Sequence, residues 1–381
     1  MKHVVILGAG FGGLELASRL SDSVADEVRV TLIDQNDGFT FGFSKLDILF
    51  GRASADAVRT PYRELATPGV AFRQERITAI DPAARHVTTD GGEYDADILV
   101  VALGAEYDID ATPGFAEGGF EYYSIAGAER MRDEALPVFS GGTILLGVLG
   151  QPYKCPPAPF EGAFLLHDQL VERGIRDDTE IRVIAPMAAP VPVTPEVSQR
   201  FLDELEARGI EYVAKKQVVE LDPAGREAVL ESGERIPYDL FVGIPIHRVP
   251  AVVKESGLAE KGWVAVDPDT LLTPFPDVYA VGDCVAIQMA KAGVFAENAA
   301  GVAADGIIAR LRGEELGRRY EGEGNCYLEF GSGRVAKVEA NFLGGPAPTA
   351  TVVGPSEALA ADKAAFGPSR RARWFGDASP V

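Results

Sequence analysis

One of the three cysteines of this chain lies in a setting that favours redox chemistry. Cys155 stands in the segment Tyr153-Lys154-Cys155-Pro156-Pro157, directly before an expected helix that begins near residue 159. The dipole of that helix and the Lys154 ammonium are expected to favour the thiolate, the nucleophilic form of cysteine. Glu161, a few residues further on, is the candidate for handling protons. A solvated carboxylate in the first turn of the helix is the alternative for Glu161.

The other two cysteines, Cys284 and Cys326, lie much further along the chain. Three cysteines are too few for the disulfide framework of a small secreted protein, so each is either an inert packing residue or part of the chemistry. Cys284 follows an expected strand-end turn, where a small packing residue is expected. His3 and His86 have no partner at metal-ligand spacing, and no cluster of Cys or His predicts a metal site.

A glycine-rich loop near the N-terminus predicts a dinucleotide site. The loop Gly8-Ala9-Gly10-Phe11-Gly12-Gly13 follows a short apolar strand and opens a helix. In this pattern Gly8 permits the tight turn, Gly10 lets backbone amides approach a pyrophosphate, and Gly13 lets the helix pack closely on the sheet. Asp34 ends the second strand, where its carboxylate is placed to accept hydrogen bonds from ribose hydroxyls.

The elements that must position these residues follow a β-α-β order twice. The apolar strands 4–7, 28–33 and 98–102 belong to the first unit, and strands 143–148 and 181–185 with helices 159–172 and 195–208 belong to the second. Further strands are expected at 263–266 and 278–281, a helix at 296–312, and strands at 326–330 and 334–342 before a charged tail. This order predicts an α/β fold with two Rossmann-like domains and a small C-terminal α+β segment. The first Rossmann-like domain is expected to comprise residues 1–105 and 250–312. The second is expected to comprise residues 106–249, and the C-terminal segment residues 313–381.

The second unit lacks the residues that would bind NAD(P)H. After strand 143–148 the chain reads Leu149-Gly150-Gln151-Pro152, so proline stands where amide donors should hold a pyrophosphate. The next strand ends in Ala185-Pro186-Met187, with no acidic residue for a ribose. The reductant is therefore not expected to be a pyridine nucleotide.

Two further segments resemble motifs of flavoproteins with two dinucleotide-binding domains. The stretch from Thr273 to Asp283 is similar to their second FAD motif, in which the terminal Asp accepts a ribitol hydroxyl. The stretch from Val101 to Ala105 is similar to their linking motif. This resemblance implies FAD as cofactor, and the residues it assigns to the FAD site beyond the first loop and Asp34 are Ala102, Gly104, Gly282 and Asp283.

The cysteine segments resemble a narrower branch, the sulfide:quinone oxidoreductase and flavocytochrome c sulfide dehydrogenase flavoproteins. The segment from Tyr153 to Glu161 is similar to their active-cysteine motif, and Cys326-Tyr327 is similar to their second redox cysteine. Segments 244–250 and 291–297 also resemble this branch, and the latter implies that Lys291 and Gly293 face the flavin. The resemblance implies a Cys155–Cys326 redox pair whose disulfide accepts hydrosulfide. Ser124 lies roughly where many sulfide:quinone enzymes carry a third cysteine, which leaves the sulfur product open.

Charge and hydropathy limit the partners. The chain carries 36 basic and 57 acidic residues, a net charge of −21, so nucleic-acid binding is not expected. The longest apolar runs are far shorter than a membrane span, and no secretory signal is visible. These features predict a cytoplasmic protein, or one bound peripherally to the cytoplasmic membrane.

The sequence therefore predicts an FAD-dependent oxidoreductase that takes electrons from sulfide or a sulfane-sulfur species and passes them to a quinone or a cytochrome. The missing export signal favours quinone. The alternative is an NAD(P)H:quinone or NAD(P)H-dependent disulfide oxidoreductase, and a homodimer stays open. Near the C-terminus, Trp374-Phe375 follows several arginines and is expected to be either an interfacial membrane anchor or part of a helix that caps the fold.

Overall fold

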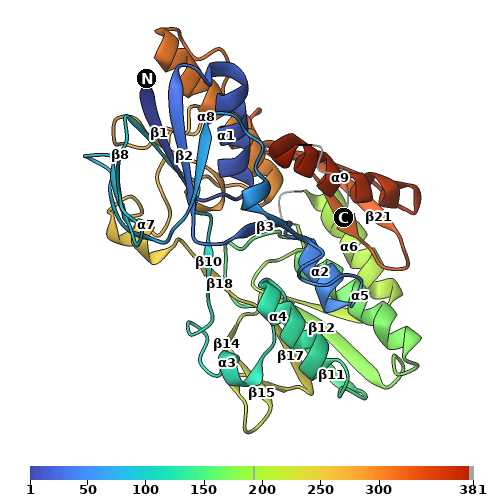
Figure 1. Ribbon diagram of the computed structural model, residues 1–381. Coiled ribbons are helices and arrows are strands. Elements are labelled where there is room, and N and C mark those ends of the chain that lie inside the picture. The colour runs from blue at the N-terminus through green and yellow to red at the C-terminus, as the bar shows by residue number, and fades with distance from the viewer. Residues whose placement is uncertain (192–193, 377–381) are drawn as a thin grey trace.

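Two parallel β-sheets lie in opposite halves of the computed structural model, which describes residues 1–191 and 194–376 (Figure 1). The first sheet has the order β19-β9-β1-β2-β5 and the second the order β13-β12-β11-β17. All neighbouring strands within them are parallel. The first sheet consists of β1 (Lys2–Leu7), β2 (Val28–Asp34), β5 (Val70–Gln74), β9 (Ile98–Val101) and β19 (Val278–Ala280). The second consists of β11 (Gly142–Val148), β12 (Thr179–Ala185), β13 (Ile210–Ala214) and β17 (Leu240–Ile244).

Helices cover both parallel sheets because the strands are apolar on both faces. Five of the six residues of β1 and all of β9 are buried, which is typical of parallel strands covered from two sides. In Figure 1 the blue α1 lies beside the orange α8, although the two are far apart in sequence, and contacts between them confirm the pairing. The helices are α1 (Phe11–Val24), α2 (Ser44–Leu49), α3 (Phe115–Gly118), α4 (Ile125–Arg130), α5 (Ala158–Glu172), α6 (Pro195–Ala207), α7 (Ala251–Glu255), α8 (Gly293–Arg312) and α9 (Ala358–Phe375).

Two short strands link the two parallel sheets along the chain. The short antiparallel pair β10 (Glu106–Asp108) and β18 (Ile246–Arg248) lies next to the expected boundaries at residues 105 and 250, which remain a proposal. The other small strands form one pair and two three-stranded sheets. They are β3 (Gly38–Thr40) with β4 (Arg59–Pro61), β6 (Ile77–Asp81) with β7 (His86–Thr89) and β8 (Glu93–Asp95), and β14 (Val218–Asp222) with β15 (Glu227–Leu230) and β16 (Arg235–Pro237).

A third sheet packs on the second half of the molecule. It is antiparallel and consists of β20 (Glu323–Glu329), β21 (Val335–Asn341) and β22 (Thr349–Ser356). The Phe330 ring after β20 stacks on Phe164 of α5 at 5.3 Å and on Phe201 of α6 at 5.1 Å between ring centroids. Arg334 donates two hydrogen bonds to Glu204 of α6. These contacts hold the end of β20 against α5 and α6.

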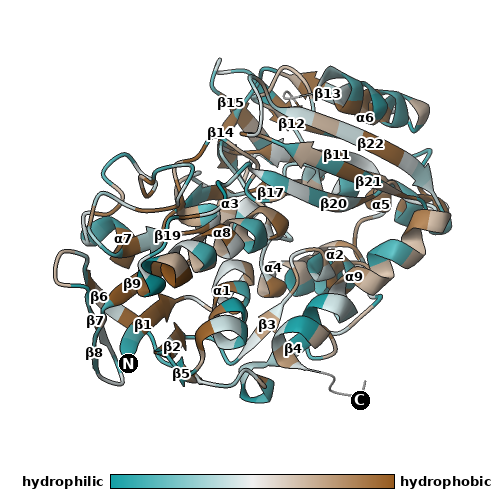
Figure 2. Cartoon of the chain, turned by 90° about the horizontal axis from the view of Figure 1, so that it is seen from above, coloured by the Kyte–Doolittle hydropathy of each residue, from teal (hydrophilic) through white to brown (hydrophobic). Residues whose placement is uncertain are grey.

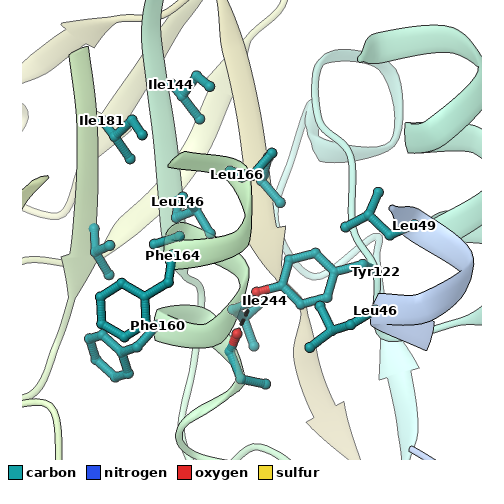
Figure 3. Packing of buried hydrophobic residues seen from close by; sticks show 14 of the residues in the cluster. Leu46, Leu49, Tyr122, Ile144, Leu146, Phe160, Phe164, Leu166, Ile181 and Ile244 are labelled. Carbon is teal, nitrogen blue, oxygen red and sulfur yellow. Dashed lines mark hydrogen bonds between the residues drawn. The ribbon is translucent and has the colours of Figure 1, made fainter. Parts of the chain in front are cut away.

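The core of the second half also holds α2 in place. Figure 3 shows Leu46 and Leu49 of α2 beside Tyr122, facing Phe160, Phe164 and Leu166 of α5 and the apolar side chains of β11 and β12. A dashed line marks the hydrogen bond that the Tyr122 hydroxyl donates to Ala158 O. The segment that links β2 to β5 therefore reaches across and packs on the second half.

One sequence expectation about the elements is wrong. Residues 263–266 do not form a strand, because only Val264 makes a bridge, to Val285. The charged C-terminal segment forms the helix α9 over most of its described length. Its apolar residues pack on the first half, and Arg373 donates a hydrogen bond to Asp22. In Figure 2 the strands β1 and β9 are mostly brown and the surrounding helices alternate brown and teal, as expected for helices with one buried face.

Candidate active site

A cavity of about 670 Å³ lies where the glycine-rich loop, the Cys155 turn and β20 converge. It collects nearly all the residues that the sequence singled out: Gly8, Gly10, Gly12, Asp34, Ala102, Gly104, Cys155, Glu161, Gly282, Asp283, Lys291, Gly293 and Cys326. Gly13 is the exception, because it lies behind the loop. A Cβ on Gly13 would come within 1.9 Å of Gly8 O, so this glycine serves the close packing of α1 on the turn.

The geometry of the loop suits a dinucleotide. Gly8 has φ of +98°, a conformation that L side chains rarely adopt, while a Cβ on Gly10 would meet no atom within 4 Å and would project into open space. The Asp34 carboxylate accepts hydrogen bonds from Ala9 N at 2.8 Å and from Asn36 N at 2.9 Å. Asp34 therefore holds the loop, and it also lines the cavity where a ribose would be bound.

A second set of glycine positions also lines the cavity, next to the glycine-rich loop. Gly104 and Gly282 have φ of +66° and +82°, and they follow β9 and β19 of the first sheet by three and two residues. Lys291 lines the cavity, but its ammonium donates to Asp283 O at 2.7 Å and Val285 O at 3.1 Å and lies 3.7 Å from the centre of the Trp263 ring. Burial lowers the pKa of Lys291, and the Asp283 charge opposes this effect. Gly293 begins α8 beside the Phe11 ring, which a Cβ would approach to 2.5 Å.

Cys155 occupies a strained turn. Its φ of +50° is in the left-handed region that is costly for a residue with a Cβ, and its backbone N donates to Lys291 O at 2.7 Å while its carbonyl accepts from Ala158 N at 2.8 Å. Strain of this kind is concentrated at functional sites. The turn places the Cys155 side chain on the cavity wall that Cys326 of β20 also lines, and both thiols are free in the structure.

The expectation that Lys154 and the helix dipole favour a thiolate at Cys155 is wrong for this structure. Burial raises the pKa of the Cys155 thiol well above its usual value, and the charges of Glu161 and Cys326 raise it further. The Lys154 ammonium donates instead to Ala105 O at 2.5 Å and lies over the Tyr107 ring. Burial also raises the pKa of Cys326, to about 12. Deprotonation of either thiol therefore needs a base in the cavity.

Glu161 is placed to be that base. It is only 3% exposed, which excludes the solvated alternative, and it accepts a hydrogen bond from Glu329 N at 2.8 Å. Burial raises the pKa of Glu161 to about 7, against the nearby Lys363 charge, which lowers it. A carboxyl with this pKa exchanges its proton near neutral pH.

Cys284 lies away from the cavity. It is fully buried in the apolar core, and its thiol donates to Val281 O at 3.3 Å. Burial raises the pKa of Cys284 to about 12, as expected of an inert packing cysteine. Among the residues that the structure describes, no cluster of His, Cys, Asp and Glu could hold a metal ion.

The expectation of a membrane anchor at Trp374 and Phe375 is wrong, and the alternative of a capping helix holds. Trp374 is 1% exposed, its indole donates to Glu15 at 2.9 Å, and its ring packs edge-on against Phe11 and Phe39. Phe375 is 2% exposed. In the described part of the chain, no helix is both long and apolar enough to cross a membrane.

Several residues of the cavity could not be recognised from the sequence. Lys45 lies on α2, Lys363 and Phe366 lie on α9, Tyr107 lies on β10, and Tyr122 and Tyr123 lie shortly before α4. None belongs to a local pattern with a known chemical role. The packing of α2 and α9 over the junction brings Lys45, Lys363 and Phe366 to the site.

Comparisons with known proteins agree with this geometry. Residues 2–301 match the family model described as pyridine nucleotide-disulphide oxidoreductase. The mitochondrial sulfide:quinone oxidoreductase of Mus musculus is 28% identical over 91% of this chain and 80% of its own length. A type II NADH:quinone oxidoreductase of Staphylococcus saprophyticus is 25% identical over 75% of each chain. The crystal structure of the sulfide:quinone oxidoreductase of Aquifex aeolicus superposes with a TM-score of 0.84 at 21% identity, covering 98% of this chain and 92% of that one.

Proposed function

This chain belongs to the pyridine nucleotide-disulphide oxidoreductase family and is a flavin-dependent oxidoreductase, and from that premise we propose that it oxidises sulfide with FAD as its flavin and a quinone as acceptor. The observation that carries the proposal is the convergence of Cys155, Cys326 and the buried carboxyl of Glu161 on a cavity that also holds the dinucleotide loop. A dinucleotide loop alone would fit many activities, but two thiols beside an acid with a pKa of about 7 fit sulfur oxidation.

The residues of the cavity fit FAD. The open space at Gly10 and the start of α1 leave room for a pyrophosphate, and the helix N-terminus favours its negative charge. Asp34 would hold the ribose, and Asp283 would hold the ribitol beside the strand-end Gly282. FAD, when bound, supplies a two-electron acceptor for the sulfur and a donor for the quinone.

The cysteines would carry the sulfur. Hydrosulfide attacks a Cys155–Cys326 disulfide, the bond between the two cysteine sulfurs breaks, and a persulfide forms on one cysteine while the other leaves as a thiolate. Glu161 accepts the proton that the attacking sulfur sheds. Formation of the disulfide requires the two Cα atoms to approach within about 7 Å.

An aromatic part of the same cavity suits a quinone. The rings of Phe43 and Phe366 lie 6.2 Å apart, and the Lys363 ammonium lies 5.3 Å from the centre of the Phe43 ring. Planar aromatic groups stack on such rings, and a lysine can donate a hydrogen bond to a quinone oxygen.

Oxidation of NADH is the second candidate, since type II NADH:quinone oxidoreductases are among the relatives. The turn after β11, where a pyrophosphate would be bound in the second half, instead carries Pro152 and the strained Cys155. This observation favours sulfide over NADH.

Anaerobic mixing of the FAD-loaded protein with sulfide or with NADH tests the proposal. We expect sulfide to bleach the visible flavin band within seconds of mixing. We expect NADH to leave the absorbance of this band unchanged. Bleaching by NADH alone would replace the proposal with the second candidate. Reoxidation of the reduced protein by a soluble ubiquinone analogue, compared with cytochrome c, identifies the acceptor.

A further inference from the structure

One lysine of the cavity has no partner for its charge. Four lysines line the cavity: Lys45 of α2, Lys363 of α9, and Lys154 and Lys291 of two loops that are joined by a β-bridge. Three of them donate to protein oxygens: Lys154 to Ala105 O, Lys291 to Asp283 O and Lys363 to Glu329. The ammonium of the fourth, Lys45 of α2, has neither a hydrogen bond nor an ion pair within the described ranges 1–191 and 194–376.

The surroundings of Lys45 make this charge costly. Burial lowers the pKa of Lys45 to about 8, and the charge of Lys154 lowers it further, while Glu121, Cys155 and Asp283 act in the opposite direction. Lys45 and Cys155 line the same cavity. A partly desolvated ammonium without an anion costs free energy, which binding of an anion would recover.

A second unpartnered donor lines the same cavity. Tyr123 is 5% exposed, and its buried hydroxyl has no hydrogen-bond partner in the described part of the chain. Buried hydroxyls are nearly always hydrogen-bonded, so an exception indicates a site for a ligand or an ordered water. Tyr123 and Cys155 line the same cavity, and the charge of Cys155 contributes to raising the pKa of Tyr123.

We propose that Lys45 and Tyr123 form a binding subsite for the hydrosulfide anion beside Cys155. The inference rests on the proposed function and specifies the substrate as the anion HS⁻ rather than neutral H₂S. Lys45 supplies the opposite charge, and the Tyr123 hydroxyl donates a hydrogen bond to the sulfur. A chain with a net charge of −21 repels anions, so a local cation is needed to concentrate hydrosulfide at the reacting cysteine. The subsite binds the ion and makes no bond to it.

The experiment compares Lys45→Met, Lys45→Arg and Tyr123→Phe with the parent protein, all saturated with FAD. Anaerobic stopped-flow mixing with sodium sulfide near neutral pH, where Lys45 with its pKa of about 8 keeps its charge, gives the half-saturating sulfide concentration and the limiting rate of flavin bleaching. A charge-assisted hydrogen bond is worth about a 10- to 100-fold change in affinity. We expect Lys45→Met to raise the half-saturating concentration by about this factor, Tyr123→Phe by a smaller factor, and Lys45→Arg to restore most of the affinity.

Lys254→Met is the matched control, because it removes the same charge from an exposed position of α7. It should leave the half-saturating concentration unchanged. An unchanged value in Lys45→Met, or an effect confined to the limiting rate, overturns the subsite. Failure of sulfide to bleach the parent protein would instead overturn the proposed function. A bromide soak of FAD-loaded crystals gives a readout that does not need turnover: an anomalous peak at Lys45 Nζ is expected in the parent and not in Lys45→Met. Its absence from the parent would also count against the subsite.

Discussion

Replacement of Glu161 by Gln should raise the stability of the protein and lower its activity. The structure holds the pKa of Glu161 at about 7, against an ordinary value of 4.5. A glutamine has nearly the same shape and can still accept the hydrogen bond from Glu329 N. It does not ionise, so it removes only the cost of holding a buried carboxylate.

The size and sign follow from linkage. A carboxyl whose folded-state pKa is raised binds its proton more tightly when folded, so its contribution to stability is fully present below about pH 4.5 and is lost as pH rises through about 7. The whole loss corresponds to about 3 kcal/mol at 1.36 kcal/mol per pKa unit, of which about 2 kcal/mol fall between pH 5.5 and pH 8. We therefore expect the advantage of Glu161→Gln over the parent to grow by about 2 kcal/mol over this range.

Urea unfolding of both proteins at pH 5.5 and pH 8 measures this change, with saturating FAD so that ligand stabilisation is equal. The lower pH stays above the isoelectric point of about 4.7. In parallel, the limiting rate of flavin reduction at saturating sulfide should rise with pH in the parent, with a midpoint near 7, and should be about 100- to 10,000-fold lower and nearly independent of pH in the variant. The limiting rate is used because ionisation of dissolved sulfide affects mainly the concentration dependence.

Glu172→Gln is the control, since Glu172 is an exposed carboxylate at the other end of α5. It should change neither the pH dependence of stability nor the limiting rate. A parent protein whose stability relative to Glu161→Gln is the same at both pH values would refute the argument that Glu161 is protonated at pH 5.5 and charged at pH 8.

Three further predictions concern the cofactor, the cysteines and the C-terminal helix. Cys155→Ser and Cys326→Ser should each abolish bleaching by sulfide while leaving FAD bound, since serine cannot form a persulfide. Cys284→Ser should stay active; an inactive Cys284→Ser with an active Cys326→Ser would show that the redox pair is misassigned. Gly10→Ala should fold normally, because its Cβ meets no protein atom within 4 Å, yet it should bind FAD more weakly in a fluorescence titration; unchanged affinity would argue against pyrophosphate at this position. Trp374→Ala should lower the free energy of unfolding by about 3–5 kcal/mol, seen as a lower melting temperature, because it leaves a cavity in the core. A normal melting temperature with impaired membrane binding would instead support the membrane-anchor interpretation.

Local patterns in the sequence were sufficient to predict the dinucleotide loop, Asp34, the two β-α-β units and the helix after Cys155. These features depend on neighbours in the chain: a turn at Gly8, close packing at Gly13 and the period of buried positions. The assignment of Cys326 came from a resemblance, because nothing in its local sequence relates it to Cys155.

Long-range packing decided the remaining properties of the site. Stacking of Phe330 on α5 and α6 brings β20 and Cys326 to the cavity, and α2 brings Lys45. Burial then sets the pKa values, raising those of Cys155 and Glu161 and lowering that of Lys45. The sequence places Lys154 next to Cys155, yet the fold directs its ammonium to Ala105 O. The sequence also places arginines beside Trp374, yet the fold buries the Trp374 indole against Glu15. A sequence specifies which charges and rings are present, but desolvation and orientation depend on the elements that close over them, and those elements come from distant parts of the chain.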